Sequence, residues 1–243
     1  MSLKLSVVVP AFNEAKQIGA CLESIHAALA ANARPGLESE LIVVDNNSTD
    51  ATAEMARAAG ANVVFEPVNQ IARARNAGAA VASGDWFLFL DADSLLPVAT
   101  LTDTLRYIET GRYVGGGSII RFDKAPWGLR LIAAAGNHGL RLCRWTAGCF
   151  MFCRADAFRD FGGFDERFFA AEDVVFGKAM KRWGRPRKLK LGFLHRNPVI
   201  TSSRKVRLYS KRELATLLVR FFLSPARTTQ SKEFLEVYYD GRR

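Results

Sequence analysis

The sequence lacks the features that mark a secreted or membrane-spanning protein. It does not begin with a basic segment followed by an apolar run and a small-residue cleavage site, so we expect no secretory leader. The longest late apolar stretch, residues 214–223, contains Arg220 and is well short of the roughly 20 residues that a spanning helix needs. We therefore expect a cytoplasmic chain whose membrane contact, if it has one, is peripheral and on the inner face.

Cysteine motifs and phosphate-loop motifs are also missing. The four cysteines show no C-x-x-C spacing, which predicts reduced, mostly buried thiols. A glycine-rich, lysine-bearing phosphate loop does not follow the first apolar segment, and its absence disfavours a nucleotidyltransferase. What the sequence does have is 49% hydrophobic residues among 243, enough for a substantial core.

Basic charge is concentrated late in the chain. Residues 178–243 contain 18 Lys and Arg against 4 Asp and Glu, whereas residues 1–177 contain 16 against 20. Such a segment favours an anionic partner, such as phosphate groups or acidic lipid headgroups, and a solvated, solubilising face explains it equally well. Nucleic acid is the partner that we expect least.

Hydrophobic patterning predicts an α/β fold. Strand-like and helix-like segments alternate with short connections over the first 95 residues, which is typical of a mostly parallel sheet with helices on both faces. The expected strands are Leu5–Val9, Leu41–Val44, Asn62–Phe65 and Trp86–Leu90, and the expected helices are Lys16–Ala31, Thr49–Ala59 and Ile71–Ala82.

The alternation weakens after Pro97. The expected helices there are Ala99–Glu109, Gly128–Leu142, Arg154–Phe161 and Glu172–Trp183, with strands at Val114–Phe122 and Thr146–Cys153. We expect residues 1–97 and 98–200 to be two halves of one domain, followed by a basic helical tail at 201–243. An amphipathic helix at Ser210–Leu223 is expected in that tail.

The most informative motif is Asp91-Ala92-Asp93, which closes an apolar run. Carboxylates at i and i+2 leave a strand on the same side, and their repulsion is tolerable mainly where a divalent cation or a proton offsets it. The polar clusters Phe12-Asn13-Glu14 and Asp45-Asn46-Asn47 follow two other expected strands. Ligands of open α/β sheets bind beyond the carboxyl ends of the strands, so the three clusters predict one ligand site.

These motifs, in this order, resemble glycosyltransferase family 2. The resemblance extends from about residue 5 to 184. It rests on Val7-Val8-Val9-Pro10-Ala11-Phe12-Asn13-Glu14, Leu41-Ile42-Val43-Val44-Asp45-Asn46-Asn47-Ser48-Thr49-Asp50, Ala74-Arg75-Asn76-Ala77-Gly78, Ser83-Gly84-Asp85, Asp91-Ala92-Asp93, Gly162-Gly163-Phe164-Asp165-Glu166 and Glu172-Asp173. It implies a GT-A fold and transfer of a sugar from a nucleotide diphosphate donor, with a UDP-sugar as the expected donor.

On the donor side, the resemblance implies that Pro10, Phe12 and Glu14 line the nucleotide pocket. It directs Asp45 at the base, with Asn47 in the same turn. A strand-end proline and an aromatic ring supply an apolar wall, and a carboxylate accepts hydrogen bonds from a base or a ribose. Ordinary core packing is the competing interpretation for Phe12, and a charge at a helix N-terminus is the competing one for Glu14.

The resemblance also implies a site for Mg²⁺ or Mn²⁺. Asp93 is expected as the direct ligand, and Asp91 nearer to the ribose or the waters of the metal. A cation on the diphosphate stabilises the charge that develops there as the sugar leaves. His195 is a candidate further ligand, although most isolated histidines bind no metal. Arg75 is placed near the donor, where its planar guanidinium suits a phosphate or a base.

On the acceptor side, the resemblance makes Asp173 the general base that takes a proton from the acceptor hydroxyl, with Glu172 beside it for orientation. A helix N-terminus also favours carboxylates on structural grounds alone. Direct attack on the anomeric carbon inverts its configuration. Residues 111–147 and 185–210 are expected as the loops that select the acceptor.

Two departures from the family pattern affect the expectation. Asp45-Asn46-Asn47-Ser48 stands where Asp-Asp-Gly-Ser is frequent, and asparagine tolerates the left-handed backbone that glycine usually supplies. The Q-x-x-R-W sequence of processive polysaccharide synthases is absent, so single additions to a hydroxyl or phosphate are expected.

Other interpretations stay open for the tail and for the activity. The apolar stripe of residues 214–222 packs on its own domain or on a second copy, or else residues 204–243 lie on an anionic membrane that carries a lipid-linked acceptor or a polysaccharide precursor. The competing functions are a nucleotidyltransferase, a non-enzymatic binder of anionic polymers, and a family member that keeps the fold without the activity.

Overall fold

The computed structural model describes residues 2–123, 127, 137, 148–204 and 229–231. The helices expected at Gly128–Leu142 and Ser210–Leu223 lie outside these residues, apart from Asn137. The proposed contacts of the tail with a membrane or a second copy also lie outside them, except at residues 201–204 and 229–231. Within the described part of the chain, no helix combines the length and the apolar character that a bilayer crossing requires.

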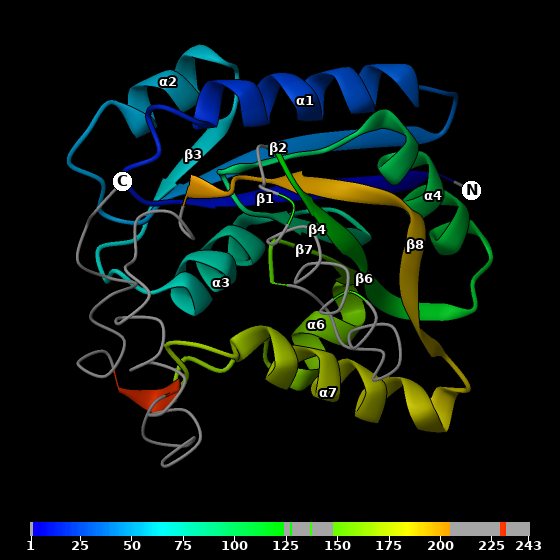
Figure 1. The fold of residues 1–243 in the computed structure, drawn as a ribbon. Coiled ribbons are helices and arrows are strands. Elements are labelled where there is room, and N and C mark those ends of the chain that lie inside the picture. The colour runs from blue at the N-terminus through cyan, green and yellow to red at the C-terminus, as the bar shows by residue number, and fades with distance from the viewer. Residues whose placement is uncertain (1, 124–126, 128–136, 138–147, 205–228, 232–243) are drawn as a thin grey trace.

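An eight-stranded mixed sheet runs through the molecule in the order β3-β2-β1-β4-β7-β6-β8-β5 (Figure 1). The strands are β1 (Leu3–Ala11), β2 (Leu37–Asp45), β3 (Asn62–Phe65), β4 (Trp86–Leu90), β5 (Ser94–Leu95), β6 (Tyr113–Phe122), β7 (Phe150–Arg154) and β8 (Lys190–Thr201). The first four strands pair in parallel, whereas β7 is antiparallel to both β4 and β6. The α/β GT-A-like fold expected from the sequence is confirmed.

Helices cover both faces of the sheet. They are α1 (Ile18–Ala31), α2 (Thr52–Ala58), α3 (Ile71–Val81), α4 (Val98–Glu109), α6 (Ala155–Phe161) and α7 (Glu172–Gly184), with a 3₁₀ turn, η1, at Arg185–Arg187. In Figure 1, α1, α2 and α4 lie on one side of the sheet, and α3, α6 and α7 on the other. Alternation along β1 supplies both layers, because Val7 and Val9 pack with the α1 side and Val8 packs with the α3 side.

Close contact between α3 and the sheet is made possible by Gly78. A Cβ atom at this position would lie 2.4 Å from Val8 Cγ1 and 2.8 Å from Val44 Cγ2, distances that real side chains do not reach. The glycine therefore lets the helix settle directly on β1 and β2. This close packing fixes the distance of α3 from the sheet. It thereby fixes the positions of Arg73 and Arg75 in the helix and of Gln70 at its N-cap.

Residues 185–210 were expected to form a loop, but the structure places strand β8 at Lys190–Thr201 within them, while their role in selecting the acceptor stays a prediction. The register shifts between the pairs Ser118–Leu194 and Ile120–Val199, so the residues between Leu194 and Val199 bulge out of the ladder. Pro198 lies in this bulge, where its missing N–H costs no ladder hydrogen bond. Pro198 and the polar residues beside it interrupt the apolar alternation by which a strand is recognised in a sequence.

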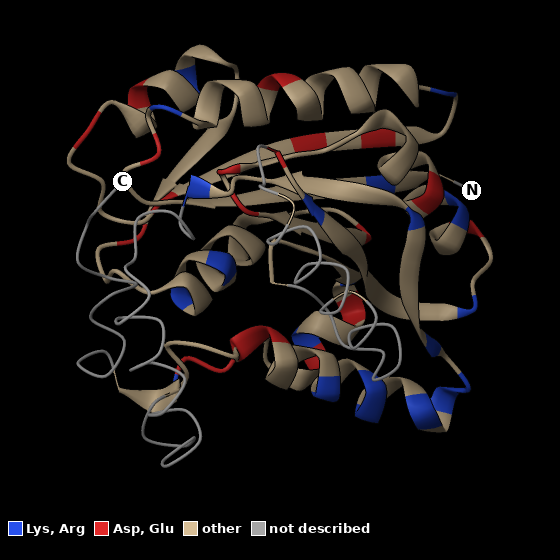
Figure 2. Cartoon of the chain, viewed as in Figure 1, with Lys and Arg blue, Asp and Glu red and all other residues tan. Residues whose placement is uncertain are grey.

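Charge is segregated along α7. Figure 2 shows acidic residues at its first turn and basic residues towards its other end. Glu172 and Asp173 lie in the first turn, and Lys181 and Arg182 in the last. Both groups complement the helix dipole. The early part of the basic segment thus has a structural explanation, and the acidic end of α7 is the end that faces the strand termini.

Candidate active site

The carboxyl ends of β1, β2 and β4 meet at one edge of the sheet. Ala11 and Asp45 are paired residues at the ends of β1 and β2, and the Asn46 N–H donates to Ala11 O at 2.8 Å. Pro10 is buried on β1, and Phe12 is half-buried just beyond it. The polar clusters predicted from the sequence to share an edge therefore lie together there.

Two asparagines shape the turn after β2. Asn13 and Asn47 have φ angles of 51° and 66°, in the left-handed region that asparagine tolerates better than most residues. Asn13 Oδ1 accepts from the Thr49 N–H at 2.8 Å, and Asp45 Oδ1 accepts from the Ser48 N–H at 3.0 Å. Asn47 thus serves where the family frequently has glycine, and its side chain is exposed at the rim. We call residues 45–50 the donor-side turn.

Glu14 lies against this turn. Its N–H donates to Thr52 Oγ1 at 2.8 Å, and its Oε2 accepts from Arg204 Nη2 at 2.5 Å. Glu14 is 4% exposed. Arg204 follows β8 and was not singled out in the sequence, where it is one basic residue among many. Its Nε and Nη1 are buried and have no hydrogen-bond partner among the described residues.

Arg75 of α3 joins the donor side to the acceptor side. Its Nη2 donates to Asp91 Oδ1 at 3.0 Å and to Gly148 O at 2.7 Å, and its Nη1 donates to Glu172 Oε1 at 2.7 Å. The side chain is 1% exposed. Burial works against the charge of Arg75, but Asp91 and then Glu172 raise its pKa, so it remains a cation. The structure thus uses Arg75 to hold carboxylates, rather than leaving it open to a phosphate or a base.

Asp173 lies beside this cluster at the start of α7. Burial, and after it the negative charge of Glu172, raises the pKa of Asp173 to about 6, while Arg75 opposes the shift. One carboxylate oxygen, Oδ1, accepts from the Val174 N–H at 2.8 Å. A Cβ at Gly148 would lie 3.1 Å from the other oxygen, Oδ2, so glycine leaves room there. A carboxyl group that titrates near neutral pH suits a general base.

The loop of residues 162–171 leads into Asp173, the base expected from the sequence, and we call it the base-bearing loop for that reason. Its start is fixed by Phe164, whose ring stacks on Phe176 with centroids 4.0 Å apart. Its end is Ala171, a non-glycine residue with a φ of 61°. From the C-terminal part of the chain, Thr229 O accepts from the N–H groups of Phe169 at 2.7 Å and Ala170 at 3.2 Å. Neither the stacking of Phe164 on Phe176 nor the hydrogen bonds to Thr229 were predicted from the sequence.

The profile of the family described as "Glycosyl transferase family 2" matches residues 6–168. The chain belongs to this family. A PGL/p-HBAD biosynthesis glycosyltransferase of Mycobacterium tuberculosis is 34% identical over 133 residues, which are 51% of this chain and 50% of the relative. A dolichol-phosphate mannosyltransferase of Pyrococcus furiosus is 31% identical over 132 residues, 48% of this chain and 35% of the relative. The chain thus matches half or less of the length of these relatives.

Solved structures share the fold at low sequence identity. The mannosyltransferase PcManGT from Pyrobaculum calidifontis, in complex with GDP-Man and Mn²⁺, has a TM-score of 0.67 and 18% identity, and the match covers 99% of this chain and 70% of that one. TarS residues 1–349 of S. aureus, in complex with UDP-GlcNAc, has a TM-score of 0.63 and 21% identity, with 98% and 73% covered. These likenesses establish the common architecture.

The carboxylates at the end of β4 fit a divalent cation whose other ligands come from the substrate. Among the described residues, no group of three or more His, Cys, Asp or Glu is arranged to hold a metal by itself. Mg²⁺, however, is commonly held by one or two carboxylates together with substrate phosphates. Asp91 and Asp93 leave the end of β4 and supply such a pair, and Asp93 is fixed by the Ser202 N–H, which donates to Asp93 O at 3.0 Å.

The structure does not bring His195 to this pair. It is exposed in the bulge of β8, between Leu194 and Val199, whereas Thr201 at the end of that strand pairs with Ser94. The expectation of His195 as a third ligand is therefore corrected. Residues 202–204, which follow β8, are the ones that reach the rim.

The three described cysteines are free, as expected. Cys21 and Cys153 are buried, and Cys149 is half-buried. Burial raises the pKa of the Cys21 and Cys149 thiols far above the usual range, so they stay protonated. They contribute packing beneath the site and no nucleophile.

Proposed function

We propose that this family 2 protein transfers a sugar from a nucleotide diphosphate donor to an acceptor hydroxyl or phosphate, with inversion and one addition at a time. The observation that carries the proposal is the placement of Asp173, with a pKa of about 6, beside an arginine that also holds a carboxylate at the end of β4. A base is thereby set next to the predicted diphosphate position. The donor-side turn and the edge location add support.

The donor is held by residues 1–97 in this proposal. Pro10 and Phe12 form the apolar wall, while Asp45 and Asn47 contact the base or ribose, and Glu14 orients Arg204 towards the phosphates. UDP-sugars are the first choice, and GDP-sugars are the alternative, since the TarS and PcManGT structures hold UDP-GlcNAc and GDP-Man. Asp91 and Asp93 would hold Mg²⁺ or Mn²⁺, which supplies charge stabilisation for the leaving diphosphate.

Residues 98–200 supply the acceptor side. Asp173, in its deprotonated form, accepts the proton of the acceptor hydroxyl as the oxygen attacks the anomeric carbon from the face opposite the diphosphate. The C–O bond to the acceptor forms while the bond to the diphosphate breaks, so the configuration inverts. Glu172 keeps Arg75 in place, and Arg75 keeps the pKa of Asp173 from rising further. A lipid-linked acceptor matches the name of the Pyrococcus relative.

A ligand screen and two variants test the assignment. A thermal-shift screen of UDP, GDP and their sugars with and without Mn²⁺ identifies the donor, because a ligand that binds only the folded state raises the melting temperature. Asp93→Asn is expected to lose the Mn²⁺-dependent shift. Asp173→Asn is expected to keep it and to lose about 10²- to 10⁴-fold in nucleotide release from the donor. Wild-type turnover by Asp173→Asn would refute the proposed base.

A further inference from the structure

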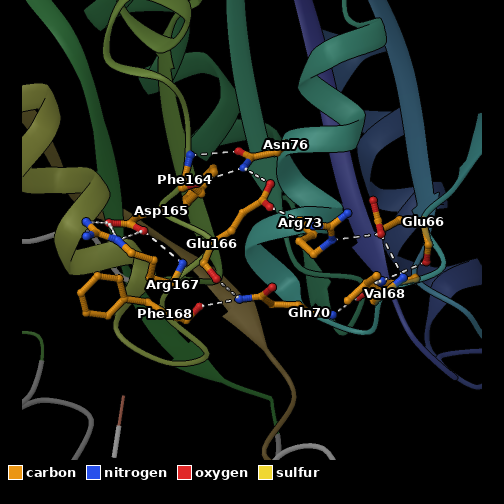
Figure 3. Close-up of polar contacts among 11 residues, drawn as sticks. Glu66, Val68, Gln70, Arg73, Asn76, Phe164, Asp165, Glu166, Arg167 and Phe168 are labelled. Atoms are coloured by element: carbon orange, nitrogen blue, oxygen red, sulfur yellow. Dashed lines mark hydrogen bonds and ion pairs between the residues drawn. The ribbon is translucent and has the colours of Figure 1, made fainter. Parts of the chain in front are cut away.

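Three side chains from α3 and its cap hold the base-bearing loop (Figure 3). Gln70 Nε2 donates to Glu166 O at 2.6 Å and to Phe168 O at 3.1 Å. Arg73 Nη1 donates to Glu166 Oε2 at 3.0 Å. Asn76 binds both polar groups of Phe164, accepting from its N–H and donating to its carbonyl, each at 2.9 Å. The loop is therefore fastened to one helix along most of its length.

Gln70 is also hydrogen-bonded to the donor-side turn. Its own N–H donates to Asn46 Oδ1 at 2.9 Å, and Asn46 is the residue that directly follows β2. Asn46 Nδ2 in turn donates to Glu66 O at 3.1 Å and to Val68 O at 2.6 Å. Asn46 and Gln70 are each 3% exposed, so these bonds are shielded from water. One residue thus bonds to the donor-side turn through its main chain and to the base-bearing loop through its side chain.

The loop needs such anchors, because its backbone ends in an unfavourable conformation. Ala171 has a left-handed φ of 61°, which costs a residue with a Cβ of the order of 1–2 kcal/mol. A strained residue of this kind persists only where the surroundings fix it. Asp173 follows two residues later, so a relaxed loop would move the carboxylate away from Gly148 and Arg75.

We propose that Gln70 is a positioning residue that makes the donor-side turn and the base-bearing loop move as one unit. The proposal rests on the proposed function for its catalytic consequence, because Asp173 matters to turnover as the base. Gln70 itself touches no reacting atom. Nucleotide bound at the turn would stabilise the loop through Gln70, and the loop would hold Asp173 ready for the acceptor.

Two substitutions remove the side-chain link in different ways. Gln70→Met keeps the length and removes both donors. Gln70→Asn shortens the reach while placing a favourable capping residue at the start of α3, so helix stability is kept. Arg167→Ala is the matched control, since Arg167 belongs to the same loop and, among the described residues, its side chain bonds to Asp165 alone (Figure 3).

Hydrogen–deuterium exchange tests the link without any activity. Amides of residues 164–171 are expected to exchange at least about 10-fold faster in Gln70→Met and Gln70→Asn than in the wild type or Arg167→Ala, while residues 41–45 stay protected. UDP or GDP with Mn²⁺ should slow exchange of the loop in the wild type and not in the Gln70 variants. Unchanged exchange in both Gln70 variants, or loop protection by nucleotide that persists in them, would overturn the proposal.

Kinetics separate positioning from general stability. With UDP-glucose, UDP-GlcNAc or GDP-mannose as probes, nucleotide release by the Gln70 variants should fall about 10- to 100-fold in kcat, with the KM for the donor changed less than about 3-fold. Equal kcat in Gln70→Asn and the wild type would contradict the role. If Asp173→Asn keeps full turnover, the proposed function fails, and the exchange experiment still decides whether Gln70 links the two segments.

Discussion

The donor-side turn and the base-bearing loop are assembled in different ways. The exposed part of the turn is closed by side chains at the ends of β1 and β2, because Asp45 accepts from the Ser48 N–H and Asn13 accepts from the Thr49 N–H. Its buried residue, Asn46, bonds instead to the segment of residues 66–70. The loop depends on partners from α3 and from Thr229, which are distant in sequence. The turn thus draws its partners from two paired strands and the segment that precedes α3, whereas the loop draws its partners from α3 and the C-terminal part of the chain. Substitutions in the exposed part of the turn should therefore act locally, and those at Asn46 or around the loop should have larger effects.

The largest expected effect is that of Arg75→Met. The substitution leaves Asp91 and Glu172 without their buried cation, so the free energy of unfolding at pH 7 should fall by about 3–5 kcal/mol. Urea unfolding followed by circular dichroism measures it.

Arg73→Met is the control for that variant, since Arg73 lies on the same helix and is about one-third exposed. We expect it to cost much less, because water screens its ion pairs. A loss below about 1 kcal/mol for Arg75→Met would show that the cluster relaxes without its arginine. The contrast between the donor-side turn and the base-bearing loop would then lose its main support.

Asn46→Asp tests the donor-side turn at its buried end. The new carboxylate would face the carbonyl oxygens of Glu66 and Val68, which now accept from the asparagine amide. We expect a loss of about 3 kcal/mol at pH 7, measured by urea unfolding. Asn47→Asp, at the exposed neighbour, should change stability very little. Equal losses of stability in the two variants would mean that the buried hydrogen bonds of Asn46 do not stabilise the turn.

Much of the fold could be predicted because its first half is locally consistent. The alternation of apolar runs and helical stripes located β4 at its observed bounds, and the Ala-rich segment after Ile71 located α3. β8 could not be predicted in this way, because Pro198 and a three-residue polar bulge interrupt the pattern that identifies a strand. The pairing of β8 with β6 is a long-range property that no local window contains.

The candidate site divides in the same manner. The strand-end carboxylates were found because they follow recognisable apolar runs. Gln70, Arg204 and Thr229 were missed, since a glutamine before a helix, one arginine in a basic tail and one threonine carry no signal of their own. Their roles come from contacts across the fold. His195 was chosen for its chemistry alone, and the bulge of β8 places it elsewhere.

Asp173→Asn should stabilise the protein while it removes the proposed base. The folded-state pKa of Asp173 is raised to about 6, so its stabilising contribution is present when it is protonated and is lost as the pH rises through that value. The asparagine variant carries no such penalty. We expect a gain of about 1–2 kcal/mol at pH 8 and almost none at pH 4, in urea unfolding at both pH values. A pH-independent difference would contradict the raised pKa.

The smallest effect is expected at Asn47, on the exposed rim of the donor-side turn. Its φ of 66° is unfavourable for alanine, so Asn47→Ala should lower the free energy of unfolding by about 1 kcal/mol. Asn47→Gly should be close to neutral, because glycine adopts this backbone readily. Neither variant should alter hydrogen exchange in residues 164–171, since Gln70 bonds to Asn46 and not to Asn47. Faster exchange of the loop in Asn47→Ala would show that the two segments are coupled through the turn backbone as well, and that the donor-side turn is less self-contained than its hydrogen bonds indicate.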